Sequence, residues 1–75
     1  MNDADLIRLV DRLEDTADSY LTLDAVRQAA PPDDVSRAID DSVLLVDYRT
    51  RLDGSPVRVC RLNRRHPLVA RLTAW

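Results

Sequence analysis

Arginine is the residue type whose spacing in this chain suggests chemistry, and it is concentrated toward the C-terminus. Residues 48–75 contain seven arginines and one aspartate, a net charge of +6, whereas residues 1–47 contain twelve acidic residues and four arginines, a net charge of −8. The planar guanidinium group matches phosphate oxygens with paired hydrogen bonds, so clustered arginines are typical of nucleic-acid interfaces. A positive end on a chain of net charge −2 therefore makes phosphate a candidate ligand.

The chain contains one cysteine and one histidine, which do not form a recognisable catalytic or metal site. Cys60 and His66 could pair as a thiolate–imidazole dyad, but a cysteine in a predicted strand and a histidine beside a predicted helix are more simply structural. Two ligands also fall short of the roughly four that zinc requires. The single glycine lies in a predicted turn and forms no phosphate-binding loop. We therefore expect no catalytic residue, no metal, no cofactor and no enzyme activity.

Three helices are predicted in the first half of the chain. Apolar residues recur at helical spacing over 6–17, and Asn2 or Asp3 can cap this helix. A short second helix follows, with Thr22 as its N-cap. The prolines at 31–32 end the second helix and open a third, because a proline disfavours helical angles in the residue before it. The short connection between these two helices is typical of a helix-turn-helix.

A β-hairpin is predicted after the third helix, at about 44–62. Strand-forming residues alternate on both sides of Asp53-Gly54, which is a signal for a tight turn. A polar connection then leads to Pro67, which opens a last helix. The predicted order is therefore a helix, a short extended strand, two further helices, a hairpin and a final helix.

The loop length of the hairpin decides which arginines lie together. A loop of two or four residues puts Arg49, Arg51 and Arg58 on one face, whereas a loop of three residues breaks this grouping. The other face then carries Tyr48, Thr50, Leu52, Val57 and Val59. Three arginines on one face repel one another unless an anion lies near them. That anion is either phosphate or an internal acid, from Asp47, the acidic first helix or a neighbouring subunit, and both interpretations stay open.

This order of elements resembles the winged-helix domain, in particular the small bacterial and archaeal domains related to the ArsR and MarR regulators. The resemblance is carried by YLTLDAV at 20–26, PDDVSRAID at 32–40 and YRTRLDGSPVRVCRLN at 48–63. It implies one α+β domain over residues 1–75, with a three-helix core, a two-stranded wing and a C-terminal helix. It also implies binding of double-stranded DNA, with the third helix in the major groove and the wing on the backbone or minor groove.

The third helix departs from that pattern because it is acidic. It carries Asp33, Asp34, Asp40 and Asp41 against the single Arg37, and carboxylates near phosphates are repelled. One hypothesis is a regulator-like module that contacts phosphates mainly through its wing. Its predicted nucleic-acid-binding residues are Arg49, Arg51, Arg58, Arg64, Arg65 and Arg37. The other hypothesis is a winged-helix module for protein interaction or dimerisation that binds no DNA.

The end of the chain offers a second candidate surface. Leu68, Leu72 and Trp75 lie on one side of the last predicted helix, where they either pack on the first helix or form the interface with a homodimer partner or another protein. A single cysteine allows no internal disulfide. No apolar run is long enough to cross a bilayer, and the N-terminus is acidic. We therefore expect a cytoplasmic protein that does not enter a membrane.

Overall fold

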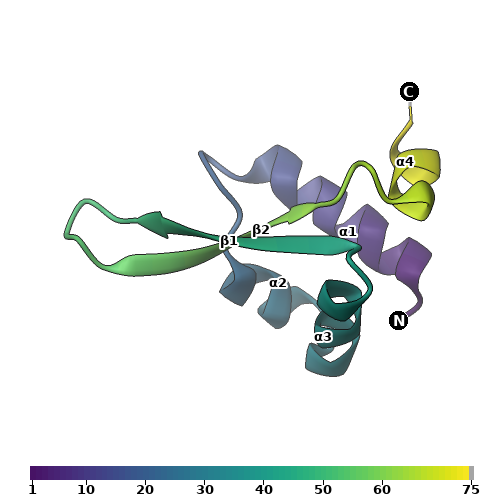
Figure 1. Ribbon diagram of the computed structural model, residues 1–75, viewed down its shortest axis with the longest axis horizontal. Coiled ribbons are helices and arrows are strands. Elements are labelled where there is room, and N and C mark those ends of the chain that lie inside the picture. Colours follow the sequence, from purple (N-terminus) through teal and green to yellow (C-terminus); the bar gives the residue numbers. More distant parts are fainter. Residues whose placement is uncertain (75) are drawn as a thin grey trace.

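Four helices and one β-hairpin make up residues 1–74, the part of the chain that this computed structural model describes (Figure 1). In chain order they are α1 (Asp3–Thr16), α2 (Leu23–Ala29), α3 (Pro32–Asp40), β1 (Leu44–Thr50), β2 (Pro56–Leu62) and α4 (Pro67–Thr73). The helices gather at one end, and the hairpin extends away from them (Figure 1). The protein is therefore α+β, with the predicted antiparallel hairpin after the third helix.

The residues predicted to start the helices do so. Asn2 accepts a hydrogen bond from the N–H of Asp5 at 2.8 Å, and Thr22 accepts one from the N–H of Ala25 at 3.2 Å. Each side chain satisfies an N–H group that no helical carbonyl can reach. Pro32 opens α3, where its missing N–H costs no helical bond. Local sequence signals thus set the beginnings of these helices.

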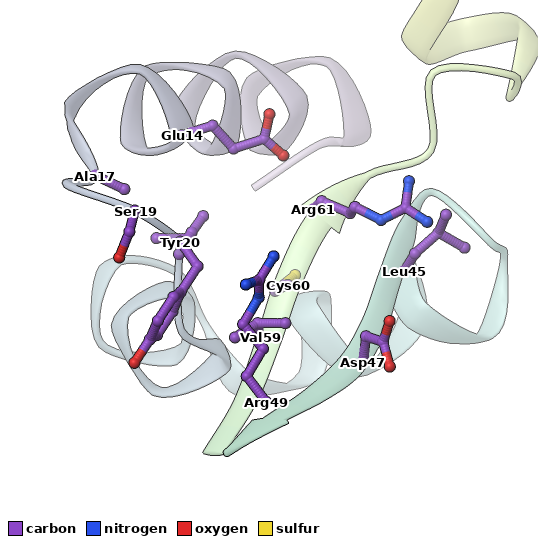
Figure 2. A pocket seen from close by; sticks show the side chains of 11 residues that line it. Glu14, Ala17, Ser19, Tyr20, Leu45, Asp47, Arg49, Val59, Cys60 and Arg61 are labelled. Carbon is purple, nitrogen blue, oxygen red and sulfur yellow. The ribbon is translucent and has the colours of Figure 1, made fainter. Parts of the chain in front are cut away.

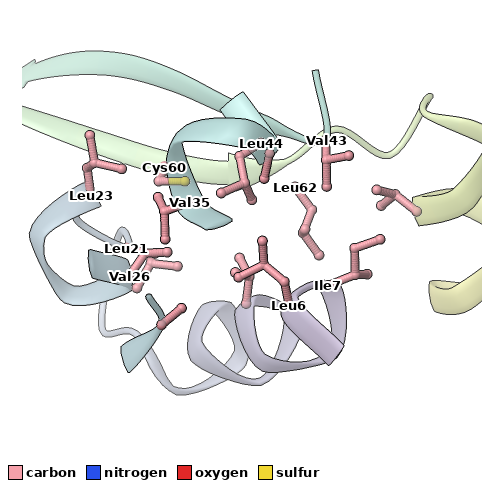
Figure 3. Packing of buried hydrophobic residues seen from close by; sticks show 14 residues of the cluster. Leu6, Ile7, Leu21, Leu23, Val26, Val35, Val43, Leu44, Cys60 and Leu62 are labelled. Atoms are coloured by element: carbon pink, nitrogen blue, oxygen red, sulfur yellow. The ribbon is translucent and has the colours of Figure 1, made fainter. Parts of the chain in front are cut away.

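The hydrophobic core lies where the helices meet the root of the hairpin (Figure 3). Its largest fully buried side chains are Leu6, Ile7, Leu23, Leu44, Leu62, Val10, Val26, Val35, Val43 and Val69. Burying one such side chain contributes about 1.5–3 kcal/mol. The segment before α2 joins this core through β2, because the N–H of Cys60 donates to the carbonyl of Leu21 at 2.8 Å and Thr22 bridges Val59. The root of the hairpin is therefore fixed, while its far half leaves the core.

Ser42 ends α3 in the left-handed conformation, with a φ of 61°. Its N–H donates to the carbonyl of Ile39 at 3.1 Å, and the N–H of Val43 donates to the carbonyl of Ala38 at 2.9 Å. This pair of bonds is the Schellman arrangement, which turns the chain and brings the apolar Val43 into the core. A side chain with a Cβ is strained at such a position, where glycine is not.

Replacing Ser42 with glycine should therefore stabilise the fold. We expect Ser42→Gly to raise the free energy of unfolding by roughly 0.5–1 kcal/mol, since relief of strain exceeds the added entropy of the unfolded chain. Urea denaturation measures the change. The matched control is Ser36→Gly, at an exposed helical position of α3, which should lower the same free energy by about 0.5–1 kcal/mol. Destabilisation by both variants would contradict the assignment of strain to Ser42.

Candidate nucleic-acid interface

The turn of the hairpin determines how its two strands pair. The N–H of Arg51 donates to the carbonyl of Ser55 at 2.9 Å, and the N–H of Gly54 donates to the carbonyl of Arg51 at 2.9 Å. Residues 52–54 thus form a three-residue loop. Gly54 has a φ of 88°, the left-handed conformation that the last position of such a loop requires. This three-residue loop is the alternative, among the loop lengths considered from the sequence, that breaks the predicted grouping of Arg49, Arg51 and Arg58.

The prediction that Arg49, Arg51 and Arg58 share one face is wrong. In the observed register Arg49 lies opposite Val57, and Arg58 lies opposite Tyr48. Residues opposed across antiparallel strands point to the same side, so Arg49 and Arg51 lie on one face and Arg58 on the other. The reason is the odd number of loop residues, which shifts the register by one and reverses the face of every β2 side chain.

The arginines of the hairpin nevertheless carry uncompensated charge. Arg49, Arg51 and Arg58 are exposed, and within residues 1–74 no carboxylate lies within 4.0 Å of their guanidinium nitrogens. Asp47, a predicted source of neutralisation, instead accepts a hydrogen bond from the N–H of Tyr48 at 2.8 Å. The hairpin therefore presents positive charge on both of its faces.

Two other arginines predicted to bind nucleic acid are already paired. Arg64 Nη2 lies 3.0 Å from Asp11 Oδ1 and 2.6 Å from Glu14 Oε2, both on α1. Burial lowers the pKa of Arg64, but the hydrogen bonds and charges of these two carboxylates outweigh it and raise that pKa above its ordinary value. Arg37 Nη2 lies 2.8 Å from Asp34 Oδ1 on the same helix. The acidic first helix thus neutralises Arg64 rather than the hairpin.

Arg65 and Arg61 are exposed and have no acidic partner within 4.0 Å among residues 1–74. The sequence prediction included Arg65 and omitted Arg61. Arg61 lies opposite Leu45, which places it on the same face as Arg49 and Arg51. The signal that could have found it is the loop length, because an odd loop gathers the odd-numbered residues of both strands on one face.

One hollow, of about 330 Å³, lies between the hairpin and the start of α2. Arg51, Arg58 and Tyr48 line it from the hairpin together with residues 56–57, and Asp24 lines it from α2. Both arginines therefore border the same hollow, although their side chains start from opposite faces of the ribbon. An anion in this place meets two arginines and one carboxylate, a net attraction.

A second hollow, of about 270 Å³, lies between the hairpin and the end of α1 (Figure 2). Arg49 and Arg61 line it, but so do Glu14 and Asp47, so its formal charges balance. The guanidinium carbon of Arg49 lies 5.6 Å from the centre of the Tyr20 ring, within the range of a cation–π contact. This hollow is less suited to phosphate than the one beside α2.

Cys60 and His66 have structural surroundings. Burial raises the pKa of the Cys60 thiol to about 11, and the charge of Glu14 adds to the effect, so the thiol stays protonated at neutral pH. His66 Nδ1 accepts a hydrogen bond from the N–H of Leu68 at 3.2 Å and so caps α4. Residues 1–74 contain no group of three histidine, cysteine, aspartate or glutamate side chains placed to hold a metal ion.

The helix α3 presents negative charge. Asp33, Asp40 and Asp41 are exposed, whereas Asp34 is engaged by Arg37 and by the N-terminal amino group, which lies 3.4 Å away. Base edges are read mainly by arginine, lysine, asparagine and glutamine. Of these residue types α3 carries Arg37 alone, which is exposed but already paired with Asp34, so this helix offers little for major-groove readout.

The second predicted surface lies on α4. Leu68 and Leu72 are half-buried and pack against the core, and α4 lies against α1. Trp75 lies outside the described residues. The part of this surface that the structure describes is thus largely covered by its own chain.

Comparison of this chain with models of protein families, with curated proteins and with solved structures finds no match. Within residues 1–74, no helix combines the length and the apolar composition needed to cross a bilayer. The geometry and charge of the hairpin are therefore the basis for assigning a function.

Glu14 ties α1 to the end of the hairpin, and its removal should cost more than loss of one ion pair. Its Oε1 accepts the N–H of Leu62 at 2.6 Å, while Oε2 pairs with Arg64. Glu14→Ala leaves that N–H without its partner, so we expect a loss of about 1–3 kcal/mol in the free energy of unfolding. Arg64→Ala, which breaks only a half-exposed ion pair, should cost about 0–1 kcal/mol. Equal losses in urea denaturation would contradict this role of Glu14.

Asp53 holds the turn through its ionised carboxylate. Its Oδ1 accepts hydrogen bonds from Ser55 Oγ at 2.6 Å and from the Ser55 N–H at 2.9 Å. The side-chain bond and then the backbone bond lower the pKa of Asp53, with a smaller effect of the Arg51 charge. Because the pKa is lower in the folded state, this stabilisation is present above the ordinary aspartate pKa and is lost as the pH falls through the lowered value.

Removing the Ser55 hydroxyl should raise the pKa of Asp53 toward its ordinary value. An NMR titration of the Asp53 carboxyl in Ser55→Ala, compared with the unaltered chain, measures the shift. Ser36→Ala, on α3, is the control and should leave that pKa where it was. An Asp53 titration that is identical in all three proteins would show that the hydroxyl is not the cause.

Proposed function

We propose that this chain is a winged-helix module that binds double-stranded DNA through its hairpin, mainly by contacts to phosphates. The order of helices and hairpin supports the winged-helix assignment. So does the short extended segment before α2, which bonds to the outer side of β2 through Leu21 and Cys60. In this arrangement β1 and β2 are the wing, and the contact to DNA is regulator-like in kind.

The observation that carries the proposal is the contrast between paired and unpaired arginines. Arg37 and Arg64 are held by carboxylates of the chain, whereas Arg49, Arg51 and Arg58 on the projecting hairpin have none within 4.0 Å among residues 1–74. Unpaired like charges on one hairpin repel one another, and a phosphate bound between two of them reduces that repulsion. The hollow lined by Arg51 and Arg58 is where one phosphate would meet two of them.

Arginines on both faces of the wing are better placed to contact the phosphates of DNA than the base edges at the bottom of a groove. Because Arg49 and Arg51 lie on one face and Arg58 on the other, the narrow ribbon can meet the phosphate backbone from either face. The acidic α3 would be repelled from the major groove. The expected binding is therefore weakly selective for sequence and strongly dependent on salt.

A titration of duplex DNA at two salt concentrations tests this function. We expect Arg51→Gln combined with Arg58→Gln to weaken binding at low salt on the order of tenfold or more. The slope of log affinity against log salt should fall by about 2, since two phosphate contacts are lost. Circular dichroism establishes that the variant is folded.

The matched control removes the same charge from the helical body. Arg12→Gln combined with Arg27→Gln changes two exposed arginines on α1 and α2 and should leave the salt slope nearly unchanged. Absence of binding at low salt would overturn the proposal. Equal weakening by the control pair would also overturn it, because net charge rather than the wing would then set the affinity.

Protein interaction is the second candidate function, and the exposed acids of α3 favour it. Asp33, Asp40 and Asp41 form a negative surface that a basic partner protein could cover. This function predicts no binding of DNA at low salt, together with a binding partner whose capture is lost in Asp40→Asn combined with Asp41→Asn. The DNA titration thus separates the two candidates.

A further inference from the structure

The outer edge of β1 is unpaired. Within residues 1–74 the sheet contains β1 and β2, and the only further strand contact, from Thr22 to Val59, lies on β2. In the half of the hairpin that leaves the helical body, no other described element lies beside β1 (Figure 1). A free strand edge is a template for another strand, and most proteins shorten or block such edges.

The hydrogen bonding of the turn shows which groups face outward. The bond between the Arg51 N–H and the Ser55 carbonyl places the odd-numbered residues of β1 in the bonded positions toward β2. The N–H and C=O groups of Val46, Tyr48 and Thr50 therefore point away from the hairpin. No backbone group elsewhere in residues 1–74 bonds to them. The Tyr48 N–H is covered only by the carboxylate of its neighbour along the chain, at 2.8 Å.

The side chains along this edge suit a second strand. Val46, Tyr48 and Thr50 are strand-forming residues on one face, and the Tyr48 side chain is 68% exposed. On the opposite face Asp47 and Arg49 carry opposite charges two residues apart. Neither has an ion-pair partner within 4.0 Å among residues 1–74. When two copies of this edge run antiparallel, Asp47 of each copy can therefore lie opposite Arg49 of the other.

The charges select one register for two antiparallel copies. The outward-facing N–H and C=O groups of β1 belong to its even-numbered residues. These groups must bond to each other across the two copies, so even-numbered residues of one copy lie opposite even-numbered residues of the other. A register that centres on Asp47 or on Arg49 sets like charges directly opposite each other, which is unfavourable. A register that centres on Tyr48 instead sets Asp47 opposite the partner's Arg49, and the two-fold axis repeats this pair. It also sets the Tyr48 ring beside the ring of the partner's Tyr48.

We infer that two copies of this chain join along β1 in this register and form one antiparallel four-stranded sheet. Two local contacts are exchanged when they do. Asp47 releases the Tyr48 N–H to the carbonyl of the partner's Tyr48, and Arg49 leaves the Tyr20 ring for the partner's Asp47. The two contacts that are lost, the hydrogen bond from the Tyr48 N–H to Asp47 and the cation–π contact of Arg49, lie at the surface, where such contacts are weak. The gain is a ladder of backbone hydrogen bonds together with two ion pairs between adjacent strands.

The dimer and the proposed binding of DNA share one residue, Arg49, but they can be tested with different residues. Arg51 and Arg58, the arginines tested for DNA binding, lie outside the central pairs, and the half-buried Leu68 and Leu72 of α4 take no part. Loss of DNA binding with an intact dimer would therefore speak against the proposed function alone. A monomer that still binds DNA would speak against the dimer alone.

Charge exchange between copies tests the register directly. Sedimentation equilibrium of the unaltered chain should show a monomer of 8.5 kDa in equilibrium with a dimer of twice that mass. Asp47→Arg alone and Arg49→Asp alone each set like charges opposite each other and should weaken self-association tenfold or more. An equimolar mixture of these two variants sets opposite charges at both positions and should form a heterodimer. The chain that carries both substitutions should again form a homodimer.

A disulfide gives a second and independent measurement. Opposed residues of a bonded antiparallel pair have Cα atoms about 5.5 Å apart, which matches disulfide geometry. Tyr48→Cys should therefore cross-link two copies under mild oxidation, while the buried Cys60 stays reduced. Thr50→Cys is the matched control, because it faces the partner's Val46 and should not cross-link.

Three results would overturn the inference. The first is a monomeric unaltered chain at the highest concentration reached, and the second is failure of the two charge variants to associate although circular dichroism shows both folded. The third is equal cross-linking by Tyr48→Cys and Thr50→Cys. Should a charge variant unfold, Thr50→Pro removes one outward N–H without a change of charge. It should abolish the dimer, and Thr50→Val should retain it.

Discussion

The left-handed backbone of Gly54 closes the hairpin with an odd number of loop residues, and most of the surface chemistry depends on that closure. Once Arg51 bonds to Ser55, every pair from the tip to the root is determined. The same register buries Leu44 and Leu62 at the root, so packing in the core and hydrogen bonding in the turn require the same strand pairing. A shift by one residue would expose one side of that core.

The distribution of charge follows from how far the hairpin extends. Arg64 comes directly after β2, within reach of Asp11 and Glu14 on α1, and it is paired there. The arginines nearer the tip, Arg49, Arg51 and Arg58, have no carboxylate within 4.0 Å among residues 1–74, although Asp24 borders the same hollow as Arg51 and Arg58. The chain therefore neutralises its basic residues where strand and helix adjoin and leaves positive charge where they separate. This is a consequence of architecture, because an extended ribbon has few neighbours.

Sequence reasoning located the helices and the hairpin because their signals are local. A side-chain cap such as Asn2 or Thr22 and a proline such as Pro32 act within one turn of helix, so they can be recognised without tertiary structure. The register could not be obtained in this way. Asp53-Gly54 fits a two-residue loop, in which both residues need a positive φ, and equally a three-residue loop, in which Gly54 alone does.

Contacts within the turn favour the three-residue loop, and these contacts cannot be recognised from the sequence pattern. Asp53 accepts two hydrogen bonds from Ser55 in the longer loop, and Leu52 becomes fully exposed. An exposed leucine is unexpected from hydrophobicity, so a prediction that keeps Leu52 in a strand selects the wrong loop. The error then propagates to Arg58 and Arg61, which change faces together. Prediction of a hairpin surface is therefore only as good as prediction of its turn.

The charge asymmetry also explains how a chain of net charge −2 can approach a polyanion. Charges in 0.15 M salt are screened beyond about 8 Å, and the molecule is 38 Å long. A phosphate in the hollow beside α2 would therefore be influenced mainly by Arg51, Arg58 and Asp24, which line it, and hardly by more distant acids. The exposed acids of α3, Asp33, Asp40 and Asp41, repel a duplex from the side of that helix. In the proposed binding, the negative body would orient the encounter, and the positive hairpin would make the contact.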